Sequence, residues 1–400
     1  MQDKHINSCM KITVFNLLTY IILICLGSCL IVACENDATM DSTEEPISLV
    51  PLEEEYDEST TKWGFIDKSG AVVIKGNYDE VNNFSEGLAA YRQKAKWGYI
   101  NKNGEIAIEA QYYNALNFEN GSAKVSNFER QYGLIDGTGK IIIPLQYQDI
   151  SRFSEGLCAV KSASKWGYID ENGKTVISNK YDAAKDFQDD RAIAKKEGAY
   201  FLIDKSGTKK SLDFDKISRL NNGMFKIKVD KKYGLMDQRG KIVIKPIYRS
   251  ISQIDKETMA VKLDGEYFLR TIRKEKIEIP KNTGVQYLGG DRWSFVQNDK
   301  TGILDNEGNL ILSPKYNIIT PFNEGYGTYQ EGQLWGYLDR DGKLLTPAVF
   351  GLTWKFQEGL ARCISREGVG FLNPKGKLEF IAKDFDVRNF QEGLARIPIK

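Results

Sequence analysis

A short phrase of the type Trp-Gly-Tyr-Ile-Asp returns about every 34 residues along most of this chain. Ten copies stand in phase, and the spacing between neighbours drifts by only one residue. Self-similarity at a fixed period indicates one supersecondary unit repeated many times, so the repeat decides the architecture. The copies begin at Trp63, Trp97, Tyr132, Trp166, Tyr200, Tyr233, Tyr267, Thr301, Trp335 and Val369.

A second motif follows each phrase by about 21 residues and reads Phe-x-Glu-Gly-Leu-Ala in its fullest form. Between the motifs stand an Asp-x-x-Gly turn and an alternating apolar run, as in residues 136–139 and 140–144. The period of two predicts β-strands, and Asp and Gly at these positions suit a type I turn. No window shows a helical period with caps. The fuller copies begin at Phe84, Phe153, Phe322, Phe356 and Phe390, and weaker ones at Phe118, Phe187, Leu220, Ile254 and Leu288.

Each unit is therefore predicted to form three or four short strands joined by tight turns. The recurring aromatic and glycine positions are assigned structural roles. These positions are Trp63, Gly64, Trp97, Gly98, Trp166, Gly167, Trp335 and Gly336 in the first motif, and Gly87, Gly156, Gly325, Gly359 and Gly393 in the second.

Together these motifs resemble the bacterial WG (KWG) repeat family over residues 62–400. The resemblance implies an all-β repeat protein of the cell envelope or the secreted fraction. Copies five to seven depart most from the pattern. Copies five and seven replace the glycine by Phe201 and Phe268, and copy seven has a charged stretch, residues 270–276, in place of the Asp-x-x-Gly turn. A locally altered hairpin is expected there.

Two arrangements of ten units are considered. The favoured one is an open solenoid or superhelix, in which each unit packs only against its neighbours. The alternative is a closed, propeller-like ring. The repeats open on a Trp-Gly strand and end on a Gly-Leu-Ala strand, residues 393–397, so the two ends could pair. Ten blades would exceed the usual four to eight.

The N-terminal residues 1–33 read as a lipoprotein signal peptide. Residues 12–33 are mostly apolar and long enough to span a bilayer, but their flanks favour a signal peptide over an uncleaved anchor. The run ends in Leu-Ile-Val-Ala-Cys34, which resembles a lipobox. Cys29 is the alternative lipidation site, and Met10 is an alternative start to Met1. Cys34 is preferred because cleavage at Cys29 would leave an apolar segment beside the lipid.

Residues 34–61 read as an acidic, disordered tether. Residues 35–61 carry ten carboxylates and no Lys or Arg, and such a segment cannot fold alone. The whole chain has 55 basic and 54 acidic residues, and residues 1–34 hold two lysines and one aspartate. Subtracting these and the tether leaves 53 basic and 43 acidic residues in the repeats. A net charge near +10 over this length does not indicate a nucleic-acid-binding protein.

The residue inventory restricts catalysis. The only histidine is His5, which lies in the predicted leader, so no His-dependent nucleophile or metal site is expected in the mature chain. No phosphate-binding loop and no zinc motif occur, and neither a metal nor another cofactor is predicted. Catalysis by a pair of carboxylates, as in a glycosidase, remains possible with these residues. The recurring glutamates stand at one repeat phase and are assigned to turns. They are Glu86, Glu155, Glu324, Glu358 and Glu392.

The cysteines and most tryptophans of the repeats are expected to be buried. Cys158 and Cys363 lie six repeats apart and are expected to be buried thiols, not a disulfide. The tryptophans of the repeat phase are expected in the core because Tyr, Thr and Val replace them in other copies. Trp293 and Trp354 lie off that phase and are assigned to face a ligand.

Three function classes follow. The leading one is a non-catalytic, lipid-anchored envelope protein whose repeats bind a partner, at the outer membrane or surface of a Gram-negative bacterium. A glycan-binding module is the second, and a carboxylate-based glycosidase is the least favoured. The expected partner is an envelope protein or a surface glycan, with the membrane contacted through the N-terminal lipid and no nucleic acid bound.

Overall fold

The computed structural model describes residues 61–220, 223–255 and 258–399. The chain divides into two units, Met1–Tyr56 and Asp57–Lys400. The predicted signal peptide, both candidate lipidation cysteines and all but the last residue of the predicted tether lie outside the described residues. The predicted repeat domain falls within the second unit, whose first strand begins at Lys62.

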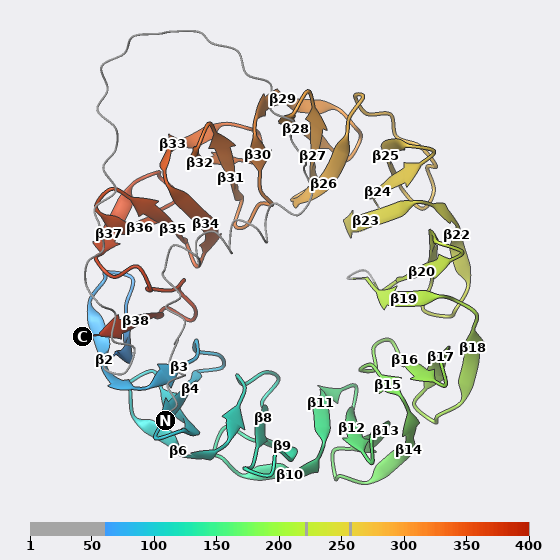
Figure 1. The fold of residues 1–400 in the computed structure, drawn as a ribbon, viewed down its shortest axis with the longest axis vertical. Helices are drawn as coiled ribbons and strands as arrows, with labels where there is room; N and C mark the ends of the chain where they lie inside the picture. Colours follow the sequence, from blue (N-terminus) through green and yellow to red (C-terminus); the bar gives the residue numbers. More distant parts are fainter. Residues whose placement is uncertain (1–60, 221–222, 256–257, 400) are drawn as a thin grey trace, which may run out of the picture. The chain divides into compact units, whose positions relative to one another are not determined.

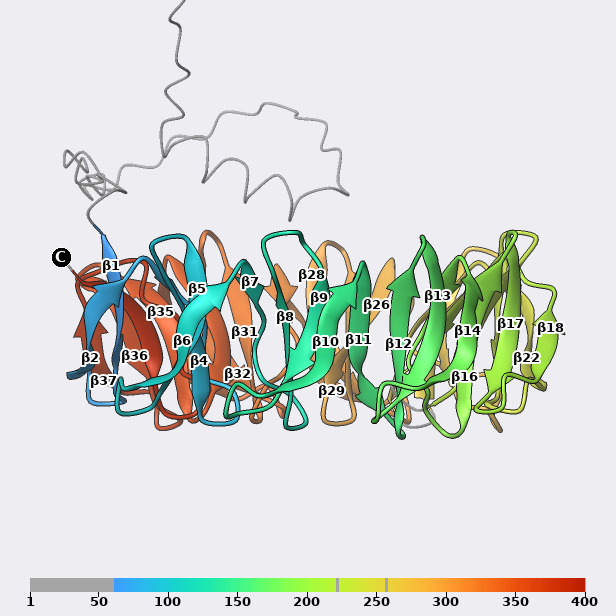
Figure 2. The same ribbon diagram turned by 90° about the horizontal axis from the view of Figure 1, so that it is seen from below.

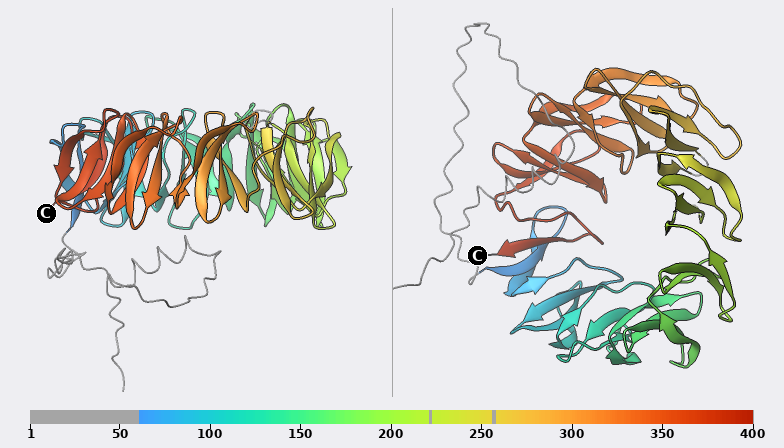
Figure 3. Two further views of the ribbon diagram at one scale, coloured as in Figure 1. Left: turned by 90° about the horizontal axis from the view of Figure 1, so that it is seen from above. Right: turned by 45° about the vertical axis from the view of Figure 1, so that its right-hand side comes forward.

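The second unit is built from small antiparallel sheets that follow one another around a ring (Figure 1). A typical sheet, here called a blade, has the strand order β3 (Glu80–Val81), β4 (Leu88–Gln93), β5 (Lys96–Asn101) and β6 (Ile106–Tyr112). The first strand lies toward the centre of the ring and the fourth at its rim. The strands run between the two faces of the ring (Figures 2 and 3).

Seven further four-stranded blades repeat this order along the chain, and an eighth has only three strands. They are β7 (Asn114–Ala115) to β10 (Ile141–Tyr147) with β8 (Ala123–Ser126) and β9 (Tyr132–Ile135); β11 (Asp149–Ser154), β12 (Leu157–Ser162), β13 (Lys165–Asp170) and β14 (Thr175–Tyr181); β15 (Ala183–Ala184), β16 (Arg191–Lys196), β17 (Ala199–Asp204) and β18 (Lys209–Leu212); β19 (Lys216–Arg219), β20 (Phe225–Val229), β21 (Lys232–Met236) and β22 (Ile242–Tyr248); β23 (Ser250–Asp255), β24 (Thr258–Leu263) and β25 (Glu266–Arg270); β26 (Gly284–Gly289), β27 (Arg292–Gln297), β28 (Lys300–Asp305) and β29 (Leu310–Tyr316); β30 (Ile318–Ile319), β31 (Tyr326–Glu331), β32 (Leu334–Asp339) and β33 (Leu344–Phe350); and β34 (Leu352–Gln357), β35 (Leu360–Ser365), β36 (Gly368–Leu372) and β37 (Leu378–Ala382).

The tenth blade joins the two ends of the repeat array. The last strand, β38 (Ala395–Ile399), pairs antiparallel with β1 (Lys62–Ile66), from Lys62 opposite Ile399 to Ile66 opposite Ala395. Strand β2 (Val72–Tyr78) completes this sheet on the other side of β1. The fold is therefore an all-β, ten-bladed closed ring, which was the alternative arrangement. The favoured open solenoid is corrected, because pairing of β1 with β38 leaves no free end.

The glycine of the Trp-Gly phrase makes room for a bulge in the fourth strand. In β5, Trp97 pairs with Tyr112 and Tyr99 with Ile108, so Gly98 alone faces three residues of β6. A Cβ on Gly98 would lie 2.4 Å from the carbonyl oxygen of Ile108. The same register shift and the same short approach to a carbonyl recur at Gly64, Gly133, Gly167, Gly234, Gly302 and Gly336.

The two copies without this glycine lack the bulge. In copy five, β17 and β18 pair in continuous register, with Phe201 opposite Ser211. In copy seven, β25 ends a three-stranded sheet, and only an isolated bridge from Leu269 to Ile277 continues beyond it. The expectation of an altered hairpin in copy seven agrees with this arrangement. A bulky residue at the glycine position and a bulged fourth strand thus exclude each other.

The core lies between blades, not within one. One cluster combines Tyr99 and Ile108 of the β3–β6 blade with Phe118, Val125 and Ile135 of the next. The Tyr99 hydroxyl also donates to the carbonyl oxygen of Leu116 across this boundary, at 2.7 Å. Each sequence repeat therefore contributes to two blades and ties them together, as stacking repeats require.

Candidate functional site

The glutamates of the Phe-x-Glu-Gly motif are bridges between neighbouring blades. Glu86 accepts the backbone N–H groups of Asn120 and Gly121, at 2.7 and 2.9 Å, in the corresponding turn of the next blade. Two successive N–H groups in a turn form a concave anion site, and the hydrogen bonds are charge-assisted. We call five residues the bridging glutamates, because each makes this pair of contacts: Glu86, Glu155, Glu324, Glu358 and Glu392.

Four of these bridges follow one another across the closure of the ring. Glu324 reaches the turn of Glu358, and Glu358 reaches that of Glu392. Glu392 then accepts the N–H groups of Glu86 and Gly87, 306 and 305 residues away in sequence, at 2.6 and 2.9 Å. The bridges thus reinforce the part of the ring where the chain itself is interrupted between Ile399 and Lys62.

Lysines of the following blade support several of the bridging glutamates. Lys102 lies 3.1 Å from Glu392, Lys205 3.3 Å from Glu155 and Lys68 3.6 Å from Glu358. Burial raises the pKa of Glu392, but the Gly87 N–H, Lys102 and the Glu86 N–H outweigh it and hold that pKa below its usual value. A carboxylate that is ionised and already satisfied by two N–H groups is poorly suited to general acid catalysis.

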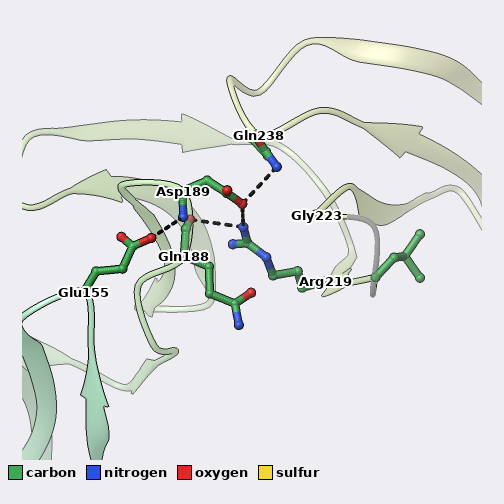
Figure 4. A pocket seen from close by; sticks show the side chains of 7 residues that line it. Glu155, Gln188, Asp189, Arg219, Gly223 and Gln238 are labelled. Atoms are coloured by element: carbon green, nitrogen blue, oxygen red, sulfur yellow. Dashed lines mark hydrogen bonds and ion pairs between the residues drawn. The ribbon is translucent and has the colours of Figure 1, made fainter. Parts of the chain in front are cut away.

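The series of bridges is interrupted where Asp189 stands in place of glutamate (Figure 4). Its side chain points to its neighbours instead, and Oδ2 accepts from Arg219 Nη2 at 2.7 Å and from Gln238 Nε2 at 2.9 Å. Arg219 also donates to the carbonyl oxygen of Gln188 at 3.0 Å. Aspartate is one methylene shorter than glutamate, so the cross-blade gap is filled by side chains of the next blade.

An open polar cleft lies at this interruption. It has a volume of about 880 Å³, and Glu155, Gln188, Asp189, Arg219 and Gln238 line it. The Asp189 side chain is about half exposed, whereas Arg219 is 20% exposed. The lining offers hydrogen-bond donors and acceptors of both charges to a polar ligand. Its described residues include no thiol, hydroxyl or imidazole that could act as a nucleophile.

The tryptophans of the repeat phase lie at the border of the core. Trp63, Trp97 and Trp166 are half-buried and pack against the clusters between blades, and Trp335 is also half-buried. Their outer parts remain in contact with solvent. They therefore combine a packing role with a partly exposed ring.

The two tryptophans assigned to face a ligand behave differently. Trp293 is fully buried, and its Nε1 donates to Asn306 at 2.7 Å, so its assignment is corrected. It packs with Ile277 in the cluster next to the incomplete blade of copy seven, where a large side chain replaces missing strand contacts. Trp354 is half-buried, and the Arg362 guanidinium stacks over its ring at 3.9 Å.

The remaining chemistry-bearing residues are inert. Cys158 and Cys363 are free, buried thiols, and burial raises the pKa of each to about 12. Within the part of the chain that the structure describes, no group of three or more His, Cys, Asp or Glu residues is placed to hold a metal ion. The same residues include no helix long and apolar enough to cross a membrane.

The comparisons with known proteins agree with the repeat geometry. The family model for the WG containing repeat matches residues 63–97, 97–127, 132–166, 166–200, 233–267, 302–335 and 335–362, together more than half of the chain. These seven matches begin at the seven copies that combine the glycine with the bulge. No curated protein is significantly similar in sequence.

Solved structures resemble the chain only distantly. The crystal structure of a eukaryotic initiation factor has 10% identity and a TM-score of 0.44, covering 80% of this chain and 94% of that one. BamB from Moraxella catarrhalis has 12% identity and a TM-score of 0.33, covering 61% and 89%. The designed protein Ika8 has 11% identity and a TM-score of 0.33, covering 66% and 93%. By these seven matches, the chain belongs to the WG-repeat family.

Proposed function

We propose that this protein is a non-catalytic binding scaffold of the cell envelope, anchored by an N-terminal lipid. The observation that carries the proposal is the use of the bridging glutamates: all five are engaged in backbone contacts between blades. The recurring glutamates of the motif therefore hold neighbouring blades together. A β-repeat ring fits a binding or interaction role, because it presents similar surfaces around its circumference.

The partner is expected to be an envelope protein or a surface glycan. The polar cleft at Asp189 and Arg219 lies where Asp189 replaces a bridging glutamate, and it offers one place for specific contacts. The glycosidase alternative receives the least support. A retaining or inverting enzyme needs two carboxyl groups facing one cavity, and in this cleft Glu155 and Asp189 are both engaged by hydrogen bonds.

The full-length chain, purified in mild detergent, is expected to capture a defined partner from envelope fractions while turning over no glycoside substrate. The control is the double variant Arg219→Gln/Gln238→Ala, which removes the side chains that hold Asp189. Capture and turnover are measured on the same preparations. A substrate cleaved by the native chain, with cleavage abolished by Glu155→Gln while the fold is retained, would establish an enzyme instead.

Lipidation is expected at Cys34, because the apolar run before it resembles a lipobox. In cells fed an alkyne analogue of palmitate, Cys34→Ala should abolish labelling and move the protein from the membrane to the soluble fraction. Cys29→Ala is the matched control and should leave labelling unchanged. Labelling that survives in Cys34→Ala and disappears in Cys29→Ala would transfer the modification to Cys29.

A further inference from the structure

The positive charge of the repeat domain is concentrated in one sector. Residues 191–249 contain 16 Lys and Arg against 6 Asp and Glu, a net charge of +10. Residues 62–400 contain 53 and 43, so the rest of the ring has 37 of each and no net charge. The sector spans strands β16 to β22, which are three strands of one blade and all four of the next. A field confined to a sixth of the sequence attracts a partner to one place, not to the whole ring.

Within and beside this sector, lysines stand opposite aromatic residues on four consecutive blades. The lysine lies on the second strand of the blade, and the aromatic residue is its direct partner on the third, so both project from the same side of the sheet. All eight side chains are half-exposed. We call them the basic–aromatic row: Lys161 with Trp166, Lys195 with Tyr200, Lys228 with Tyr233, and Lys262 with Tyr267.

The row does not continue with free lysines around the ring. At the same position, Arg92 faces Trp97 but is neutralised by Glu80 at 2.6 Å. Four of the other blades have the uncharged residues Ser126, Val296, Gln330 and Ile364. Among the side chains that the structure describes, none of the four row lysines is ion-paired with a carboxylate. Their charge is thus available to a ligand.

The row lies on the face opposite the bridging glutamates. The turn of Glu155 precedes the second strand of its blade, β12, and the row lysine Lys161 stands near the other end of that strand. Nearby, Asp182 is held by Lys165 at 2.5 Å and by the Glu197 N–H at 2.6 Å, so it adds little free negative charge. Asp230 and Asp264 lie in the adjoining turns. Asp230 is counted in the net charge of residues 191–249, and Asp264 lies outside that range.

We infer that the basic–aromatic row binds an anionic polysaccharide that runs across four blades. Repeated ammonium groups along an extended path match a linear polymer with repeated carboxylate, sulfate or phosphate groups. The lysine ammonium groups lie over the rings of their own tyrosines, at 5.2 Å in the Lys195 pair, 5.5 Å in the Lys228 pair and 4.5 Å in the Lys262 pair. Lys262 donates to the Tyr267 hydroxyl at 3.4 Å, so the ring edges and the hydroxyls of Tyr200 and Tyr233 are left for contacts with sugar hydroxyls.

This arrangement is less suited to the other anionic polymers. Single-stranded nucleic acid is held by bases that stack on open aromatic faces, and here lysines occupy three of the four rings on one side. A membrane surface calls for apolar side chains that insert beside the basic ones. The exposed aliphatic residues of this sector, Ile242 and Ile247, lie on the rim strand β22 and not in the row.

The inference deepens the binding role proposed above and is tested with defined polymers on the full-length chain. Polygalacturonate is the probe, dextran the neutral polymer, and an oligothymidylate and phosphatidylglycerol vesicles represent the other anionic classes. We expect binding of polygalacturonate that weakens with added salt, weaker binding of the oligonucleotide and vesicles, and none of dextran. Equal binding of dextran, or tighter binding of the oligonucleotide or vesicles, would overturn the inference.

Two charge-matched variants locate the site. Lys195→Gln/Lys228→Gln removes two row lysines and is expected to weaken polygalacturonate binding at least tenfold. Lys209→Gln/Lys210→Gln removes the same charge from the exposed rim strand β18 and is expected to change binding less than twofold. Melting curves of both variants verify folding. Equal losses in the two would show diffuse attraction without a site. Failure to bind polygalacturonate would refute the row alone, since capture of an envelope protein is measured separately.

Discussion

Gly98→Ala is expected to lower the free energy of unfolding by roughly 3 kcal/mol, at the upper end of the range for overpacked interiors. The added Cβ would lie 2.4 Å from the Ile108 carbonyl oxygen and 2.7 Å from the Ala110 nitrogen. Both are backbone atoms of the bulge in β6, which cannot move without breaking the sheet. Urea denaturation followed by tryptophan fluorescence measures the loss.

Gly87→Ala is the matched control. Gly87 has a φ of 80° in the Glu-Gly turn, and no atom lies within 4 Å of the Cβ it would acquire. Its cost is therefore backbone strain alone, on the order of 1–2 kcal/mol. If Gly98→Ala costs no more than Gly87→Ala, close approach of the bulge is not the reason for glycine in the Trp-Gly phrase.

The repeat length, the strand content and the turn glycines could be predicted because they depend on residues close in sequence. An Asp-x-x-Gly turn is specified by four residues, and strands are specified by alternation. The role of Gly98 could not be predicted in the same way. It depends on Ile108 and on the register of β6, which no local pattern reveals. The exchange of glycine for Phe201 and Phe268 in the irregular copies was the only available signal.

The bridging role of the glutamates was also missed, although a signal existed. Their fixed phase before a glycine indicated a turn, and a turn with two successive free N–H groups requires an acceptor. That acceptor comes from the preceding blade, 34 residues away, as Glu86 and Asn120 illustrate. Trp293 was misplaced for a similar reason, since its burial depends on the incomplete sheet of copy seven.

Closure of the ring could be named only as an alternative, because it rests on contacts between the most distant parts of the sequence. The strand β38 contributes Ala395 to a cluster that also contains Ile66 and Phe390. A chain that stops after Leu394 should lose this strand pairing, at a cost of roughly 5 kcal/mol or more if each backbone hydrogen bond contributes about 1 kcal/mol. A chain that lacks only Lys400 is the control. Thermal unfolding compares the two.

A circular permutant separates closure from a general effect of truncation. In the native ring the chain is interrupted between the second and third strands of one blade. In the neighbouring blade these strands are joined by Lys94 and Ala95, whose φ angles of 50° and 62° identify a two-residue hairpin turn.

The permutant joins Ile399 to Lys62 through Asn-Gly and opens the chain between Lys94 and Ala95. In a closed ring this moves the interruption by one blade, so stability should stay within about 1 kcal/mol of the 62–399 fragment, as for other compatible turn changes. An open array would instead be strained by the new link, and a permutant that fails to fold would contradict the closed ring.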